Sequence, residues 1–244
     1  MSPLSLLVGA EVRERARRGD PLTVSQSVPA GAESAARGAP GANISYITER
    51  VWTGGDLPSD LGVAEMLADL SAIRGAGITD ILDNRIEWTD EDFIQAHAPD
   101  LGYRWNGADD AGQLMPDSWF DRGVGFALAA LEDPDAQVLA HCHMGINRGP
   151  SMAFAILLAL GLEPGAALTA IRASRPIAAI AYADDALDWW HRSAKTPAAV
   201  AQRQVAEVAA WHRSNPLDVG TLIRLMRDNE GKGRPSSVSS GWTG

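Results

Sequence analysis

A strand, a loop and a helix that follow one another between Val138 and Leu158 constrain this chain most. Val138 to Ala140 form an apolar run that predicts a short buried strand. Pro150 to Leu160 combine apolar residues with good helix formers and predict a buried helix. The loop between them begins at Cys142 and ends at Arg148. Loop N–H groups and a helix N-terminus both attract anions, so the segment predicts an anion site.

Cys142 and Arg148 add the chemistry of a nucleophile and of an oxyanion binder to this loop. Cys142 is the only cysteine in the chain, so no internal disulfide explains it. A lone cysteine is often just a small buried residue. A cysteine reacts as the thiolate, however, and a helix N-terminus and a nearby guanidinium both stabilise that anion. Arg148 can bind two oxygens of one phosphate.

The sequence His141-Cys142, five further residues and Arg148 resembles the signature of cysteine-dependent protein phosphatases, especially the compact dual-specificity branch. The resemblance extends from about residue 44 to residue 192. It implies a three-layer α/β fold, a cysteinyl-phosphate intermediate, and neither a metal nor another cofactor. It also implies that His141 hydrogen-bonds within the loop, that Ser151 supplies a supporting hydroxyl, and that the phosphate is bound by His143, Met144, Gly145, Ile146, Asn147 and Arg148.

The resemblance further implies a carboxylic acid in the loop between residues 106 and 115. Asp110 lies 32 residues before Cys142 and ten before Phe120, which matches the interval of compact family members, whereas Asp109 fits one residue worse. We therefore prefer Asp110 as the general acid, with Asp109 as the alternative. An ordinary turn-forming loop acid would explain either residue without any catalytic role.

Four positions around the signature leave questions that the residues alone do not decide. Gly149 stands where the family usually has the Ser or Thr that helps the cysteine to leave, so we expect slow turnover or an accumulating intermediate. His143 either tunes substrate preference or faces solvent, and Asn147 is expected to brace the loop. Arg175 occupies a position where the family often has a basic residue near the pocket rim, although an arginine complementing a helix C-terminus explains it equally well.

Alternating strand and helix patterns elsewhere predict a largely parallel sheet covered by helices. The predicted strands are 44–53 (a strand pair or bent strand), 78–82, 102–105 and one that begins near 137. The predicted helices are one capped by Ser59 or Asp60 and ending near Arg74, then 89–97, 116–131, 163–174 and 184–193. The first helix is expected to bury Leu61, Ala64, Leu67, Ala68 and Leu70. In such folds ligands bind at the carboxyl ends of the strands, where Cys142 falls.

Composition divides the chain into four segments. Residues 1–42 predict an N-terminal arm or linker, in which 1–18 have the pattern of an amphipathic helix and 19–42 are rich in Pro, Gly, Ala and Ser. Residues 43–194 are the phosphatase-like domain. Residues 195–230 predict a helical extension, with helices opened by Thr196-Pro197 and Asn215-Pro216. Residues 231–244 predict a disordered tail. The extra helices most simply pack against the core, with a homodimer contact, a lid or a partner surface as alternatives.

The net charge and the single cysteine limit the partners and the cellular compartment that we expect. A formal net charge of −10 argues against nucleic-acid binding and offers no attraction to an anionic membrane. No stretch has the length and apolar character of a spanning helix. One cysteine fits a reducing compartment, so we expect a cytoplasmic protein. Abundant Ala, Arg and Gly suggest a bacterial source with a GC-rich genome.

These observations lead to one functional expectation and three alternatives. We expect a phosphomonoester hydrolase that acts on phosphoprotein, on phosphotyrosine or phosphoserine/threonine, or on a small phosphoester. The main alternative is a catalytically weak pseudophosphatase that serves as a phosphate-binding interaction module. An RNA 5′-triphosphatase is opposed by the acidic charge, and a sulfur-transfer enzyme is opposed by the signature spacing and the upstream acid.

Overall fold

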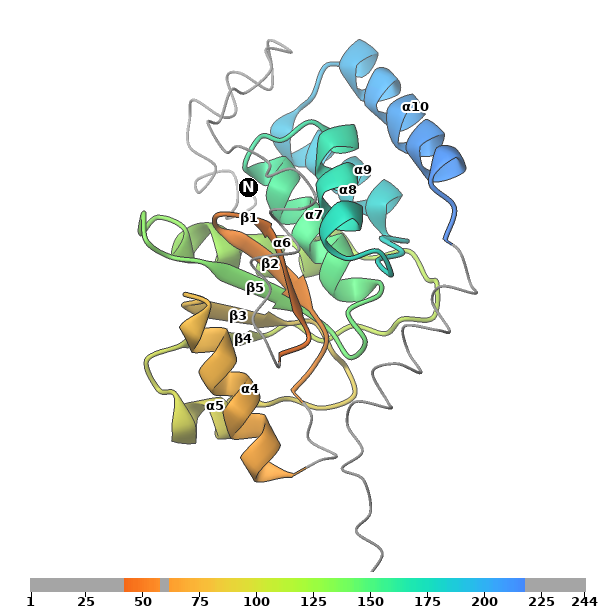
Figure 1. The fold of residues 1–244 in the computed structure, drawn as a ribbon. Coiled ribbons are helices and arrows are strands. Elements are labelled where there is room, and N and C mark those ends of the chain that lie inside the picture. The colour runs from red at the N-terminus through yellow and green to blue at the C-terminus, as the bar shows by residue number, and fades with distance from the viewer. Residues whose placement is uncertain (1–41, 58–61, 218–244) are drawn as a thin grey trace, which may run out of the picture.

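Five strands form one sheet at the centre of the fold (Figure 1). The computed structural model describes residues 42–57 and 62–217. The strands lie in the order β1-β2-β5-β3-β4, with β1 antiparallel to β2 and all other neighbours parallel. Their bounds are β1 Ile44–Thr48, β2 Val51–Gly54, β3 Asp80–Asp83, β4 Gly102–Trp105 and β5 Val138–His141. The predicted α/β class and the mostly parallel sheet are confirmed.

Helices cover both faces of the sheet, which makes three layers (Figure 1). Two lie on one face: α4 (Val63–Gly75) and α5 (Glu91–His97). On the other face lie α6 (Asp117–Ala130), α7 (Arg148–Ala159), α8 (Pro164–Ser174) and α9 (Ala183–Ala194). The last described helix, α10 (Ala198–Ser214), packs outside α8 and α9. Within the described residues, no helix is long and apolar enough to cross a bilayer.

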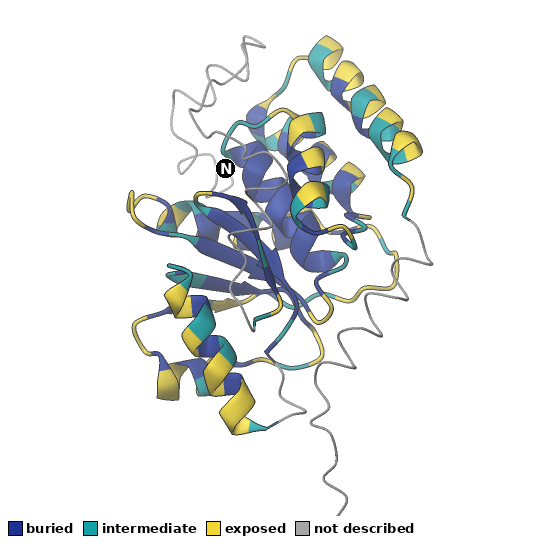
Figure 2. Ribbon diagram, in the orientation of Figure 1, coloured by how far each residue is buried: buried dark blue, intermediate teal, exposed yellow. Residues whose placement is uncertain are grey.

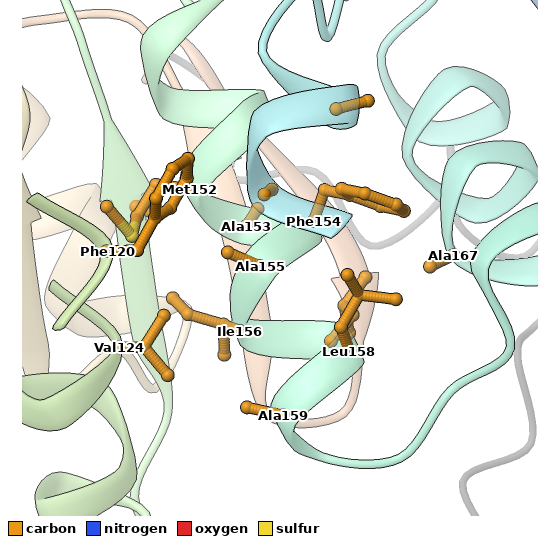
Figure 3. Close-up of a cluster of buried hydrophobic side chains, with 14 of the residues drawn as sticks. Phe120, Val124, Met152, Ala153, Phe154, Ala155, Ile156, Leu158, Ala159 and Ala167 are labelled. Carbon is orange, nitrogen blue, oxygen red and sulfur yellow. The ribbon is translucent and has the colours of Figure 1, made fainter. Parts of the chain in front are cut away.

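Residues on β5 alternate between the two cores, as a strand with both faces covered requires. Val138 and Ala140 belong to the larger core with α6 to α9, whereas Leu139 belongs to the smaller core with α4 and α5. The helix that follows, α7, is buried along its whole length (Figure 2). Its side chains contact residues of both flanking helices, among them Phe120 and Ala167 (Figure 3). A helix that is apolar all round is expected in such a central position.

The prediction for α4 was wrong about its buried face. Ala64, Leu67 and Ala68 are exposed, whereas the larger side chains of Met66 and Ile73 are buried together with Leu70. Because apolar residues are spread around this helix, the pattern alone did not select the stripe that packs. The helix begins at Val63, and both proposed capping residues and Leu61 lie outside the described residues.

The N-terminal arm and the C-terminal tail that the sequence predicted remain predictions. The arm at 1–42 and the tail at 231–244 lie almost wholly outside the described residues. The helix predicted after Thr196-Pro197 is confirmed as α10, which begins at Ala198. The helix predicted after Asn215-Pro216 falls outside the described residues beyond position 217.

Candidate active site

The carboxyl ends of three central strands meet at one edge of the sheet. In the parallel register His141 stands beside Gly54 of β2 and Asp83 of β3. The segments that leave these strands therefore start side by side: Gly55-Asp56, Asn84-Arg85 and the loop that begins at Cys142. This is the edge at which parallel α/β sheets bind ligands, and Cys142 follows β5 there, as the sequence predicted.

The loop from Cys142 to Arg148, called the anion loop below, turns its carbonyl groups outward. The oxygen of His143 accepts from the Asp56 N–H at 3.0 Å, and that of Ile146 accepts from the Ala179 N–H at 2.6 Å. The oxygens of Met144 and Gly145 accept from the Arg175 guanidinium at 2.9 and 2.5 Å. In a planar trans peptide the N–H points away from the C=O. The N–H groups of residues 144–147 therefore face the opposite, inner side and form an anion nest.

Arg175 lies beneath the anion loop and not at a pocket rim. It is 5% exposed, and its guanidinium also donates to the side chains of Asn43 (2.9 Å) and Ser45 (3.3 Å). Burial lowers the pKa of Arg175 to about 10, so the group stays charged at neutral pH. A Cβ added at Gly145, whose φ is +64°, would lie 2.3 Å from this guanidinium. The glycine is thus needed both for its backbone angle and for the approach of Arg175.

Cys142 lies at the base of the nest and is 2% exposed. Its N–H donates to the Gly54 oxygen at 3.2 Å, which ties the start of the loop to β2. The prediction that the His141 ring hydrogen-bonds within the loop was wrong. Among the described residues, the ring Nδ1 has no hydrogen-bond partner. As the last residue of β5, His141 alternates with Ala140 and turns toward the α4 and α5 face, where its Nε2 is 3.7 Å from Asp83 Oδ1. Burial lowers the pKa of His141, so its ring is neutral at neutral pH.

Arg148 is held so that one edge of its guanidinium stays available. The group carries five N–H bonds. Nη1 donates to Glu87 Oε2 (2.9 Å) and to the Ala108 oxygen (2.8 Å), and Nη2 donates to Glu87 Oε1 (2.6 Å). Two N–H bonds have no partner in these contacts: the single N–H of Nε and the second N–H of Nη2. Both lie on the same edge of the guanidinium. Nε is buried without a hydrogen-bond partner among the described residues. That edge can bind two oxygens of a phosphate.

Glu87 is the partner that sequence reasoning missed. It follows the carboxyl end of β3 by four positions, so a polar residue just after a buried strand was the available signal. The hydrogen bonds from Arg148 lower the pKa of Glu87 to about 2, and it is ionised at neutral pH. Burial lowers the pKa of Arg148, but the opposing effects of Glu87, Cys142 and Asp110 together raise it above its ordinary value.

Asp110, and not Asp109, is directed at the site. Asp110 Oδ2 is 3.6 Å from Arg148 Nε, and Oδ1 accepts from Asn147 Nδ2 at 2.6 Å and from the Tyr182 hydroxyl at 2.9 Å. Within the described residues, the Asp109 side chain makes no hydrogen bond or ion pair; only its backbone oxygen accepts, from Gln113. The geometry therefore supports the preferred choice between the two acids.

His143 is tied to the body of the protein although its side chain remains 46% exposed. Its Nδ1 is 2.7 Å from Asp56 Oδ2, and its ring meets the edge of Trp88 at a centroid distance of 5.1 Å. Burial raises the pKa of Asp56, against the opposing effects of His143 and Arg85. The His143 side chain thus faces solvent in part while one ring nitrogen is bound to Asp56, and its role in substrate preference stays a prediction.

Ser151 and Gly149 occupy the first turns of α7. The Ser151 hydroxyl is buried, donates to Asn147 Oδ1 at 3.3 Å and accepts from the Tyr182 N–H at 3.3 Å. The hydroxyl therefore supports the anion loop from behind and does not face the anion nest. A Cβ added at Gly149 would stand 3.0 Å from Ala140 O and from two backbone atoms of His141. The close approach of α7 to β5 thus explains a glycine where the family has Ser or Thr.

A cysteine at the end of a central parallel strand, an anion nest and an arginine at the following helix are the features of the cysteine-dependent phosphatase fold. No family model matches the sequence, and no curated protein is significantly similar to it. The crystal structure of DUSP15 is similar with a TM-score of 0.50 and 17% identity, over 67% of this chain and 95% of DUSP15. The resemblance predicted from the signature is thereby confirmed at the level of the fold.

Two further solved structures are similar to the chain. PTPMT1 in complex with PI(5)P has a TM-score of 0.48 and 17% identity, over 66% of this chain and 98% of PTPMT1. Tk-PTP in the active form has a TM-score of 0.48 and 15% identity, over 63% of this chain and 97% of Tk-PTP.

Proposed function

We propose that the chain is a cysteine-dependent phosphatase that hydrolyses phosphomonoesters of phosphoprotein, on tyrosine or on serine/threonine. The observation that carries the proposal is the convergence of three groups. Cys142 is followed by the outward-turned carbonyls of the anion loop; the loop N–H groups and the free edge of Arg148 together supply charge stabilisation; and Asp110 Oδ2 is 3.6 Å from Arg148 Nε. They correspond to the nucleophile, the charge stabilisation and the proton donor that phosphate-ester cleavage requires.

The proposed reaction has two displacements at phosphorus. In the first, the Cys142 thiolate forms the S–P bond while the ester P–O bond breaks, and the leaving oxygen takes a proton from Asp110. Arg148 and the loop N–H groups stabilise the charge on the three remaining oxygens. In the second, water attacks phosphorus and gives its proton to Asp110 as the S–P bond breaks. Inorganic phosphate leaves, and the thiolate and the protonated acid are restored.

A phosphate-binding module with crippled turnover is the second candidate, and Gly149 is the observation that favours it. A hydroxyl at this position helps the cysteine to leave in the family that the signature resembles. The contact with the backbone of β5 leaves little room for any side chain there. In this reading the anion loop would persist for recognition, and the second displacement would be slow.

Hydrolysis of an aryl phosphate in the presence of EDTA tests the proposal. We expect wild-type turnover, no turnover in Cys142→Ser, and a loss of about a hundredfold in Asp110→Asn, the lower range for removal of a general acid. Asp109→Asn is the matched control and should retain wild-type activity, because the Asp109 side chain makes no hydrogen bond or ion pair with any described residue of the site.

Three other outcomes discriminate among the alternatives. A stoichiometric burst without turnover would support the module with a stalled second step. Vanadate binding with neither burst nor turnover would support a pure binding role. A large loss in Asp109→Asn and a small one in Asp110→Asn would reverse the assignment of the acid. Phosphotyrosine and phosphoserine peptides, compared at equal concentration, then define the substrate class.

A further inference from the structure

The Asn147 side chain has a defined orientation, which follows from its neighbours. Its Oδ1 accepts from the Ala181 backbone N–H at 2.7 Å, and a backbone N–H can only donate. The amide oxygen must therefore face Ala181, which directs Nδ2 at Asp110 Oδ1, 2.6 Å away. No flip of the amide satisfies both contacts.

The Tyr182 hydroxyl is oriented in the same way. The Gly112 N–H lies 3.4 Å from the Tyr182 oxygen, and this donor leaves the hydroxyl proton for Asp110 Oδ1 at 2.9 Å. Burial and the adjacent carboxylate raise the pKa of Tyr182 to about 12, so the hydroxyl keeps its proton at neutral pH. The ring is held edge-on against Trp119 at a centroid distance of 6.4 Å.

The two donors distinguish the oxygens of Asp110. A carboxylic acid has one carbonyl oxygen and one hydroxyl oxygen. Oδ1 accepts two hydrogen bonds and therefore serves as the carbonyl oxygen. The proton of the acid is then on Oδ2, which lies 3.6 Å from Arg148 Nε, on the guanidinium edge that is free for phosphate.

We propose that Tyr182, together with Asn147, is a positioning residue that keeps the transferable proton of Asp110 on Oδ2. The inference rests on the proposed phosphatase function and adds a residue that the signature does not contain. Asp110 sits in the loop after β4, Asn147 in the anion loop and Tyr182 directly before α9. The two donors thus hold the acid over the anion loop. In the second displacement the same oxygen, Oδ2, receives the proton of the attacking water.

Leaving-group dependence tests this role. A phenyl ester needs protonation of its leaving oxygen more than a 4-nitrophenyl ester does. We would compare kcat/KM, which reports the first displacement before the shared hydrolysis step. In Tyr182→Phe, the ratio of kcat/KM for 4-nitrophenyl over phenyl phosphate should rise about tenfold, as expected for loss of one hydrogen bond to the carboxylate that forms as Asp110 gives up its proton. Asp110→Asn should raise the ratio further.

Tyr103→Phe is the matched control. Its hydroxyl also donates to a buried carboxylate, Asp83 Oδ2 at 2.6 Å, but does not touch Asp110. It should lower stability and leave the substrate ratio unchanged. Tyr182→Phe keeps the ring against Trp119 and should retain the wild-type inhibition constant for vanadate. Asn147→Ala removes the other donor and should also raise the ratio.

The outcomes separate this inference from the function on which it rests. An unchanged ratio in Tyr182→Phe, with a raised ratio in Asp110→Asn, overturns the inference and leaves the phosphatase proposal standing. An equal rise in Tyr103→Phe also overturns it, since the effect would then be structural. Absence of turnover in the wild type refutes the proposed function and the inference with it.

Discussion

Replacement of Arg175 by methionine tests what orients the anion loop. Arg175→Met keeps an unbranched side chain of similar length and removes the donors. The substitution leaves the carbonyl oxygens of Met144 and Gly145 without these donors, next to a side-chain position that is itself 5% exposed at Arg175. We expect both a loss of stability and a loss of anion binding. Without the Arg175 donor, nothing holds these carbonyl groups in the outward direction, and the N–H groups on the opposite side of the same peptides lose their inward orientation.

The contacts set the size of the effect. A buried acceptor left without a partner costs about 1–3 kcal/mol. Two such oxygens cost about 2–6 kcal/mol in total, and relief from burying a cation beside neutral acceptors offsets part of this cost. We therefore expect a loss of about 3 kcal/mol in the free energy of unfolding, which lowers Tm by about 6–12 °C in a domain of this size. Affinity for vanadate should fall at least about tenfold, or about 1.4 kcal/mol.

Thermal unfolding and vanadate inhibition of aryl-phosphate hydrolysis are the two measurements. Arg50→Met is the matched control. The Arg50 guanidinium also donates to backbone carbonyls, among them Leu131 O at 2.7 Å and Ala136 O at 3.2 Å, but Arg50 precedes β2 at the other end of the sheet. It should lower Tm and leave vanadate affinity unchanged.

Two results would refute the reasoning about Arg175. The first is a free energy of unfolding of Arg175→Met that lies within about 1 kcal/mol of the wild-type value, which is below the cost of one unpartnered buried carbonyl. The two oxygens would then have other donors. If the variant loses stability but binds vanadate like the wild type, the guanidinium supports the fold without setting the direction of the loop peptides.

Two other substitutions have defined outcomes. Because the pKa of Glu87 is lowered from 4.5 to about 2, its pairing with Arg148 adds stability that is present above pH 4.5 and lost as the pH falls through about 2. The Tm difference between wild type and Glu87→Gln should shrink over this range in calorimetry, and a pH-independent difference would contradict the pairing. Gly149→Ser places a Cβ 3.0 Å from Ala140 O and should cost about 1–3 kcal/mol in denaturant unfolding. Its added hydroxyl should also shorten the life of a cysteinyl phosphate, seen as a smaller burst, and an unchanged burst would show that Gly149 does not limit the second step.

Much of the fold was predictable because its signals are local. Strand β4 was predicted with the bounds observed, and the helix after Glu163-Pro164 ends at Ser174 as predicted. These elements are marked by apolar period, by proline at helix starts and by glycine or proline at their ends. The buried face of α4 was not predictable, since several stripes of that helix are apolar and only packing selected Met66, Leu70 and Ile73.

The sequence by itself determined the centre of the candidate site. Cys142, the anion loop and Arg148 are contiguous, so a short strand followed by a tight loop and a helix places them together without help from distant residues. The spacing to Asp110 was informative only through the family resemblance. The predicted division of the chain, the homodimer contact and the cytoplasmic, bacterial setting stay predictions.

Only the tertiary structure decided what holds these groups in place. Arg148 meets Glu87 across 61 positions, Asp110 meets Tyr182 across 72, and the Gly145 oxygen meets Arg175 across 30. Glutamate, tyrosine and arginine are common in loops and at helix ends, so the residue type alone does not predict such a partner. The pairings arise from the strand register and from the packing of α8 and α9 behind α7, which no local pattern encodes.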